Sequence, residues 1–206
     1  MAYIENSQNN EESEKSSQKL HCLKTSDLFN FYIGTNAGGK LKTSIEKAKK
    51  SIRIASPYVS KAEIEMLREK YLGKMDNITI ITAAEEDLAN KAHVEGLKSL
   101  IHREKQKDSA RCEYNAIFKS VIFRGSFFHA KFYIIDDEIV YAGSMNFTGK
   151  GLEKSIETCI TFKDSDTVQK LIVYFEQLFN ANLYKWDISV LGKKVYEKLK
   201  SNGGKS

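Results

Sequence analysis

Hydrophobic and polar positions follow two rhythms along the chain, one typical of β-strands and one typical of α-helices. Short apolar or alternating runs predict strands over residues 31–33, 51–55, 77–82, 116–123, 128–135, 139–142 and 156–162. Apolar residues at helical spacing predict helices that include Leu41, Ile45 and Ala48 and that span residues 61–72, 85–104 and 166–182. From Phe132 onwards the strand is apolar on both faces, which is typical of a central strand. Strands interleaved with helices predict an α/β domain with a mixed β-sheet flanked by helices.

The two ends of the chain differ in composition from its middle. Residues 1–19 are rich in polar side chains and hold too few apolar ones to bury a core, which predicts a disordered polar tail. The stretch after Gly192 is rich in lysine and ends in Gly-Gly-Lys-Ser, which predicts a basic C-terminal tail over residues 193–206. We therefore expect one folded domain over residues 20–192.

The charge of the chain permits a polyanionic partner without requiring one. The 206 residues carry a formal net charge of +5. Residues 1–19 contain four Glu and two Lys, net −2, so the remainder carries +7. No apolar run reaches the roughly 18–20 residues of a membrane span, and the N-terminus lacks the basic and apolar regions of a secretory signal. A cytoplasmic protein without a membrane span is the expectation.

The polar residues with the clearest chemical meaning lie between residues 128 and 157. His129 and Lys131 are two residues apart on a predicted strand, so their side chains should face the same site. The next strand leads into Gly-Ser-Met-Asn, where Ser144 offers a hydroxyl and Asn146 an amide. Glu157 begins the strand after that.

These side chains suit the cleavage of a phosphodiester without a metal ion. A neutral imidazole such as that of His129 is a competent nucleophile near pH 7. Lys131 and Asn146 can stabilise the charge that develops on the phosphate oxygens. A carboxylate such as Glu157 can accept the second ring N–H of the histidine and so fix its tautomer. The leaving oxygen also needs a proton donor, and no other side chain of this segment supplies one.

The spacing of these residues resembles a known catalytic motif. His129, Lys131 and Asp136 follow the pattern His-x-Lys-x4-Asp, and Gly143-Ser144-x-Asn146 and Glu157 follow downstream. This pattern resembles the HKD motif of the phospholipase D superfamily, and its spacing is similar to that of the small bacterial nucleases of that family. The upstream segment KAKKSIRIASPYVS resembles, more weakly, the first helix–strand unit of the family.

The resemblance implies a role for each matching residue. His129 would be the catalytic nucleophile that forms a phosphohistidine intermediate. Lys131 and Asn146 would bind the substrate phosphate, with Ser144 beside it. Glu157 would orient the His129 ring.

Asp136 belongs to the same catalytic motif, but the resemblance implies a different task for it. Members of the family tend to place this aspartate away from the reacting phosphorus. We therefore expect Asp136 to be structural and to accept hydrogen bonds from backbone at the turn that contains it.

The motif occurs once, whereas members of the family combine two copies in one active site. The remaining histidines, His21, His93 and His102, have no lysine two residues later and no Gly-Ser-x-Asn after them. We expect all three to be surface residues, and His129 of a second subunit to complete the site in a two-fold symmetric homodimer. No cysteine or histidine spacing indicates a metal site, and neither a metal nor another cofactor is expected.

Three functions remain open for this sequence. The first is a nuclease, expected to be an endonuclease, that hydrolyses DNA or RNA. The second is a phospholipase or phosphatidyltransferase that acts on lipid head groups, and the third is a non-catalytic nucleic-acid-binding module. Arg103, Lys105, Lys107 and Arg111 predict a solvated charged loop, with a nucleic-acid contact as the alternative.

Overall fold

The computed structural model describes residues 21–24, 28–35, 37–107, 111–125, 128–181 and 184–203. The residues outside these ranges include the predicted polar tail 1–19. The strands are β1 (His21–Lys24), β2 (Phe29–Gly34), β3 (Ile52–Ala55), β4 (Ile78–Ala84), β5 (Ile101–Lys105), β6 (Cys112–Ala116), β7 (Lys119–Arg124), β8 (Phe132–Ile135), β9 (Ile139–Gly143) and β10 (Glu157–Phe162). The helices are α1 (Ala37–Lys47), α2 (Lys61–Tyr71), α3 (Lys91–Leu100), α4 (Ser165–Asn180) and α5 (Ile188–Gly203), with a short π-helical turn, η2 (Lys150–Lys154).

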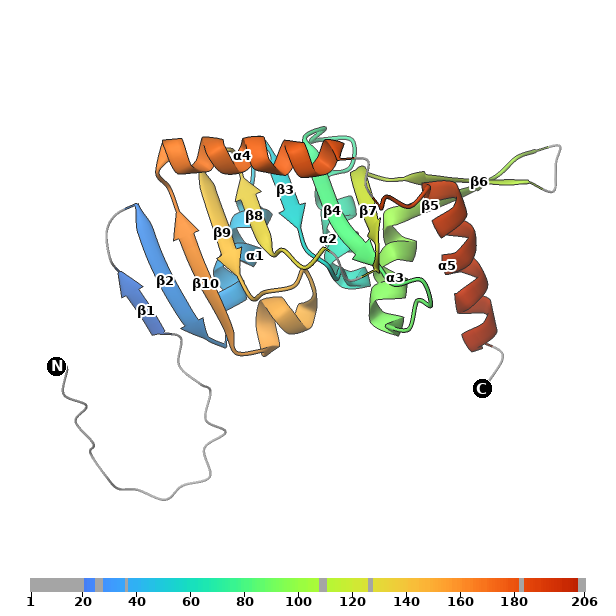
Figure 1. Cartoon of the computed structure of the whole chain (residues 1–206), viewed down its shortest axis with the longest axis horizontal. Coiled ribbons are helices and arrows are strands. Elements are labelled where there is room, and N and C mark those ends of the chain that lie inside the picture. The colour runs from blue at the N-terminus through green and yellow to red at the C-terminus, as the bar shows by residue number, and fades with distance from the viewer. Residues whose placement is uncertain are drawn as a thin grey trace, which may run out of the picture.

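Eight strands form one mixed β-sheet in the order β1-β2-β10-β9-β8-β3-β4-β7, and β5 and β6 form a separate hairpin (Figure 1). β4 pairs in parallel with both β3 and β7, while the other pairs of the large sheet are antiparallel. All four residues of β8 are buried, as a strand with apolar residues on both faces requires. The predicted α/β fold with a mixed sheet flanked by helices is confirmed.

Two apolar clusters cover the two faces of the sheet. On one face, side chains of α1, α2, α3 and α5 pack against sheet residues such as Ile54 and Tyr133. On the other face, α4 contributes Val168 and Phe175, which pack with Phe132 of β8. Figure 1 shows α4 running across the sheet on the side opposite α1 and α2. This arrangement leaves the ends of the strands open for polar side chains.

The structure corrects the prediction for the region between α3 and β7. The helix predicted over residues 85–104 is shorter, since it begins at Lys91 and ends at Leu100, and the chain then continues directly into β5. After Ile101 the next four residues of β5 are exposed, so no apolar position distinguished this strand from a solvated helix. Its partner β6 was not predicted, since the strand predicted over residues 116–123 overlaps β6 only at Ala116.

The predicted charged loop is also wrong in part. Arg103 and Lys105 lie on β5 and pair in register with Tyr114 and Cys112 of β6. The charged side chains are therefore presented by an antiparallel hairpin, which holds them in fixed positions.

The basic tail predicted over residues 193–206 is wrong for the part that the structure describes. α5 extends from Ile188 to Gly203. Its Leu191 and Val195, one helical turn apart, are fully buried in the main core, and Leu199 packs against that core. The folded domain therefore extends beyond residue 192, and the lysines of this segment lie on the outer side of a packed helix.

Candidate active site

Four of the predicted site residues lie together where β8 and β10 begin and β9 ends, which we call the catalytic edge of the sheet. His129 and Lys131 precede β8, Ser144 follows β9, and Glu157 is the first residue of β10. β9 runs antiparallel to both β8 and β10, so the start of β8, the end of β9 and the start of β10 coincide. Residues up to 28 positions apart in sequence thus become neighbours.

His129 and Lys131 come together without the strand geometry expected for them. β8 begins only at Phe132, and residues 128–131 have no regular secondary structure. Phe128 is buried and stacks on Phe123 with ring centroids 5.5 Å apart, which anchors this segment against the sheet. The His129 side chain that follows is exposed, and the Lys131 Nζ lies 3.2 Å from each of its ring nitrogens. Nζ also donates to the His129 carbonyl oxygen at 3.0 Å.

Lys131 is fixed at both its backbone and its side chain. The Gly143 N–H donates to the Lys131 carbonyl oxygen at 3.2 Å. Partial burial lowers the pKa of Lys131, while the negative charge of Glu157 acts in the opposite direction. A half-buried ammonium beside an exposed imidazole has the charge and the hydrogen-bond donors that binding an anion requires.

Ser144 and Glu157 are joined by a hydrogen-bond network at the same edge. The Ser144 hydroxyl donates to the Glu157 carboxylate and accepts from the Thr158 N–H at 3.0 Å. The Ser144 N–H donates to the Thr158 carbonyl oxygen at 3.1 Å. The Glu157 carboxylate therefore bonds Ser144 in this structure rather than the His129 ring, and its orienting role stays a prediction.

Gly143 permits this network because no larger residue fits between β9 and β10. A Cβ atom on Gly143 would lie 2.0 Å from the Thr158 carbonyl oxygen, which accepts the Ser144 N–H. The glycine of the Gly-Ser-x-Asn motif is thus required by the close approach of two backbones.

Asn146 occupies a rigid position that leaves its amide oxygen without a donor. On one side of it, the Met145 carbonyl oxygen accepts from the Tyr133 hydroxyl at 2.7 Å. On the other side, the Phe147 N–H donates to the Ser56 hydroxyl at 2.9 Å. The Asn146 Oδ1 is buried and has no hydrogen-bond partner within the described residues. Because such groups are rare and costly, we expect a donor from outside the chain to meet it.

Asp136 lies at the opposite end of β8 from His129. Its Oδ1 accepts from the backbone N–H groups of Lys49, Lys50 and Ser51 at 2.9, 2.7 and 3.1 Å. The backbone bonding predicted for Asp136 is therefore present, but it holds the connection from α1 to β3 rather than the turn that contains Asp136. Asp136 and Asp137 themselves adopt positive φ angles of 56° and 59°, which form the tight turn between β8 and β9.

His93 is buried, which corrects its predicted place on the surface. The Val59 N–H donates to Nδ1 at 3.1 Å, and Nε2–H donates to the Ala83 carbonyl oxygen. Burial lowers the pKa of His93, so the ring is neutral. The signal for this burial was present in the sequence, because His93, Leu97 and Leu100 fall on one face of a helix. Of the other two histidines, His102 is exposed as predicted, and the side chain of His21 lies outside the described part of the structure.

A small pocket lies beside His129, and no pattern in the sequence indicates it. Its lining residues come from the loop after β3, the end of β4 with the residue after it, and the segment between β7 and β8: Pro57, Tyr58, Ala83, Glu85, Gly125, Phe128 and His129. The Tyr58 hydroxyl donates to Glu85 Oε1 at 3.4 Å, and burial together with the Glu85 charge raises the pKa of Tyr58. His93 lies behind this pocket and links two of its segments, because it hydrogen-bonds to the loop after β3 and to the end of β4.

Two further properties bear on what this chain can bind. In the ranges that the structure describes, no group of three or more His, Cys, Asp or Glu side chains could hold a metal ion. None of the helices there combines the length and apolar character needed to cross a membrane.

The fold and the motif can now be set beside known proteins. Residues 41–179 match the family model described as "Cardiolipin synthase, PLD-like domain". The structure is similar to NucT from Helicobacter pylori, with a TM-score of 0.52 and 20% identity over 72% of this chain and 94% of NucT. It is also similar to Nuc from Salmonella typhimurium, a phospholipase D family member, with a TM-score of 0.52 and 18% identity over 77% of this chain and 97% of Nuc. None of the curated proteins matches the chain.

The two kinds of similarity carry different weight. At identities of 20% and 18% the structural likeness shows a shared fold. The family model covers more than half of the chain and includes every residue of the His129 motif. The protein therefore belongs to the phospholipase D-like (PLD-like) superfamily.

Proposed function

We propose that this protein is a phosphodiesterase that hydrolyses nucleic acid, DNA or RNA, by a metal-independent mechanism with a phosphohistidine intermediate. The observation that carries the proposal is the exposed His129 ring with the Lys131 ammonium 3.2 Å from both of its nitrogens. An exposed imidazole is accessible to a bulky substrate, and the ammonium offers a position for one of the phosphate oxygens beside it.

The reaction follows from these positions in two steps. In the first, a ring nitrogen of His129 attacks phosphorus, a P–N bond forms and the P–O bond to the leaving group breaks. The leaving oxygen takes a proton from the imidazolium of a second His129. In the second step, that imidazole removes a proton from water, the water oxygen attacks phosphorus and the P–N bond breaks. Lys131 and Asn146 stabilise the charge on the phosphate oxygens throughout, and Ser144 keeps Glu157 beside the site.

The second imidazole is proposed to come from another copy of the chain. The sequence contains one His-x-Lys pair of this type, so one subunit supplies one catalytic ring. Ile156, directly before Glu157, is 57% exposed, and an exposed apolar side chain at the site edge suits a subunit contact. A symmetric dimer with its axis at this edge would pair the two rings.

Nucleic acid is favoured over lipid on the basis of charge. The chain has a net charge of +5, and phosphate backbones attract such surfaces. The matching family is described by a lipid enzyme, cardiolipin synthase, so a lipid phosphodiester is the second candidate substrate. The similarity to Nuc and NucT points to nucleic acid rather than lipid, but it rests on the fold alone.

Chemical trapping tests the proposal directly. The purified protein would be incubated with 32P-labelled single- and double-stranded DNA, RNA and phosphatidylcholine vesicles, each with and without EDTA, and then denatured. We expect EDTA-resistant cleavage of nucleic acid and acid-labile label on His129. Cleavage that EDTA abolishes, or that His129→Ala retains, would refute the mechanism, and cleavage of the lipid alone would refute the substrate class.

Mixed dimers test the shared site. Wild-type subunits would be mixed with increasing amounts of His129→Ala subunits under conditions that allow exchange. If each site needs two His129 rings, activity per wild-type subunit falls as the variant fraction rises. Constant activity per wild-type subunit would show that one chain is sufficient.

A further inference from the structure

The β5–β6 hairpin is held rigidly against α5 at one end of the molecule. Tyr114 of β6 packs so closely on α5 that a Cβ atom on Gly192 would lie 2.6 Å from its ring. The Tyr114 ring is also 5.6 Å from that of Tyr196, one helical turn further along α5. The guanidinium of Arg103 lies over the Tyr196 ring, 5.4 Å from its centroid. These contacts place the charged residues of the hairpin in defined positions.

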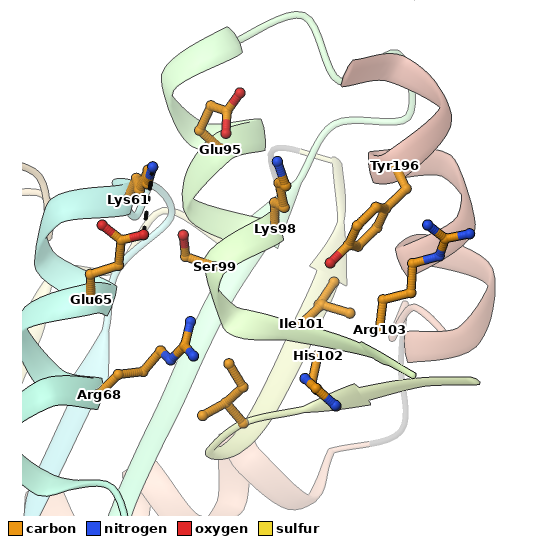
Figure 2. A pocket seen from close by; sticks show the side chains of 11 residues that line it. Lys61, Glu65, Arg68, Glu95, Lys98, Ser99, Ile101, His102, Arg103 and Tyr196 are labelled. Atoms are coloured by element: carbon orange, nitrogen blue, oxygen red, sulfur yellow. Dashed lines mark ion pairs between the residues drawn. The ribbon is translucent and has the colours of Figure 1, made fainter. Parts of the chain in front are cut away.

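Two adjoining pockets share Arg103 and Tyr196 and together form a groove between α2, α3, the hairpin and α5. Figure 2 shows the first of the two pockets. The cationic residues of its lining are Lys61, Arg68, Lys98, Arg103, Arg111, Lys193 and Lys200. The acidic residues are Glu65, Glu95 and Glu197. The lining thus carries seven positive and three negative charges, which makes it strongly basic. We call it the hairpin groove.

Most of this positive charge is not neutralised within the protein. Lys61 forms an ion pair with Glu65 at 3.6 Å. Arg68, Lys98, Lys193 and Lys200 form no ion pair with any residue that the structure describes, and all four are exposed. Figure 2 shows the Tyr196 hydroxyl directed away from α5 into the pocket that Lys98 and Arg68 also line. Unpaired cations around a hydroxyl donor are a typical arrangement for binding phosphate.

The hairpin groove is separate from the catalytic edge. None of its lining residues lines the pocket beside His129. His93, behind that pocket, lies in the first turn of α3, whereas β5 begins where α3 ends. Glu95 and Lys98 of the groove follow His93 on α3 by about 3 Å and about 8 Å of helix, and the groove continues from there along β5 to α5.

We propose that the hairpin groove binds the sugar–phosphate backbone of a nucleic acid whose scissile phosphate lies at His129. This inference rests on the proposed function and adds a second contact, remote from the chemistry. The aromatic rings of the groove pack against each other, against Gly192 and against Arg103, so they do not present free faces to bases. Recognition in the groove is therefore through phosphate, independent of sequence.

An acidic membrane surface fits the groove less well. Membrane-bound surfaces combine basic residues with exposed apolar side chains that enter the bilayer. The aliphatic residues of the lining are Ile101, which is buried, and Ile117, which is half-buried. A polyanion without an apolar layer is the better match.

Binding measurements with a catalytically inactive background test the inference. In His129→Ala protein, Arg103, Lys193 and Lys200 would be replaced together by alanine, and binding to fluorescein-labelled DNA of 30 nucleotides, single- and double-stranded, would be followed by anisotropy over a range of salt. The matched control replaces Lys47, Lys70 and Lys74, three exposed lysines outside the groove, which removes the same charge. We expect the groove variant to bind at least about tenfold more weakly at ~0.1 M salt, with a salt slope lower by about 0.7–0.9 per lost phosphate contact.

The outcomes separate the groove from the active site. With His129 present, the groove variant should hydrolyse bis(p-nitrophenyl) phosphate, which is too small to reach the groove, at the wild-type rate. If wild-type protein does not cleave this diester, the proposed function fails. If it does, and groove and control variants bind DNA equally, the groove inference is overturned. Binding to vesicles of anionic lipid with no binding to DNA would overturn it as well. Should the triple variant not fold, the double variant Lys193→Ala/Lys200→Ala, which alters two exposed helix positions, decides the question.

Discussion

The Lys131 ammonium lies 3.2 Å from both ring nitrogens of His129 although the two residues do not belong to a strand. The contact depends on the anchored Phe128 ring before the pair and on the bond from the Gly143 N–H to the Lys131 carbonyl oxygen after it. A phosphate oxygen that binds Lys131 is thereby brought next to the nucleophile. The pair should accordingly act as one functional unit, with Lys131 effective only when His129 is present.

Replacing Lys131 by methionine should lower kcat/KM about 10²–10³-fold, the usual effect of removing a donor to a transition-state oxyanion. Partial burial lowers the pKa of Lys131 below its ordinary 10.5. As the pH is raised, Lys131 should therefore lose its proton, and the enzyme its activity, at a pH below 10.5. Lys131→Arg, whose guanidinium stays protonated, should retain part of the activity and lose this alkaline decline. A pH–rate profile of kcat/KM for the three proteins measures both effects. An alkaline decline that persists unchanged in Lys131→Arg would assign it to another group.

Asp136 should influence stability and leave the chemistry intact. Replacing Asp136 by alanine leaves the N–H groups of Lys49, Lys50 and Ser51 without their acceptor. It also places alanine at a φ of 56°, where its side chain cannot form a hydrogen bond that would stabilise this conformation. We expect a loss of about 2–4 kcal/mol in the free energy of unfolding, measured by urea denaturation. Asp136→Asn keeps an acceptor oxygen and tolerates this φ, so its loss should be less than half as large. Turnover per folded molecule should be unchanged in both variants, and a selective loss of turnover in folded Asp136→Asn would place the carboxylate in the reaction.

Gly143→Ala should disrupt the catalytic edge. Its methyl group would meet the Thr158 carbonyl oxygen at 2.0 Å, so β9 and β10 must separate where Ser144 bonds Glu157. We expect a loss of about 1–3 kcal/mol in stability and a larger proportional loss of activity at temperatures where the variant is folded. Gly149→Ala is the matched control, because its Cβ would meet only a Glu63 carboxylate oxygen, at 3.3 Å. Equal activity losses in the two variants would contradict a specific role for the β9–β10 contact.

The polar site was largely readable from the sequence because its residues are close together along the chain. His129 and Lys131 directly precede β8 and Ser144 directly follows β9, and a tight turn joins these two strands, so local spacing was sufficient to place the three residues near each other. Glu157 was placed at the start of β10 for the same reason. The bond that Glu157 makes was less predictable, because a carboxylate can reach several donors and the choice depends on the separation of β9 and β10.

Other features depended on contacts between distant segments. The pocket beside His129 joins the loop after β3, the end of β4 and the segment before β8, which no local pattern connects. β5 carries four exposed residues after Ile101, so only pairing with β6 defines it as a strand. α5 was missed because its lysines obscured the buried Leu191 and Val195.

His93 should make the stability of the protein sensitive to acid. Burial lowers its pKa below the ordinary 6.5, while the carbonyl oxygens of Ala83 and Val59 and the charge of Glu85 oppose the shift only in part. On acidification below about pH 6.5 the unfolded chain takes up a proton at His93 that the folded protein does not, so the free energy of unfolding falls as the pH falls, by at most about 1.4 kcal/mol per pH unit from this group. Urea denaturation between pH 7 and pH 5, followed by the fluorescence of Trp186, would measure the slope. His93→Gln should flatten it, whereas His102→Gln, at an exposed position of β5, should leave it unchanged. Equal slopes for wild type and His93→Gln would mean that His93 does not cause the pH dependence of the free energy of unfolding. Protonation of His93 would then also not weaken the loop that holds Tyr58 beside His129.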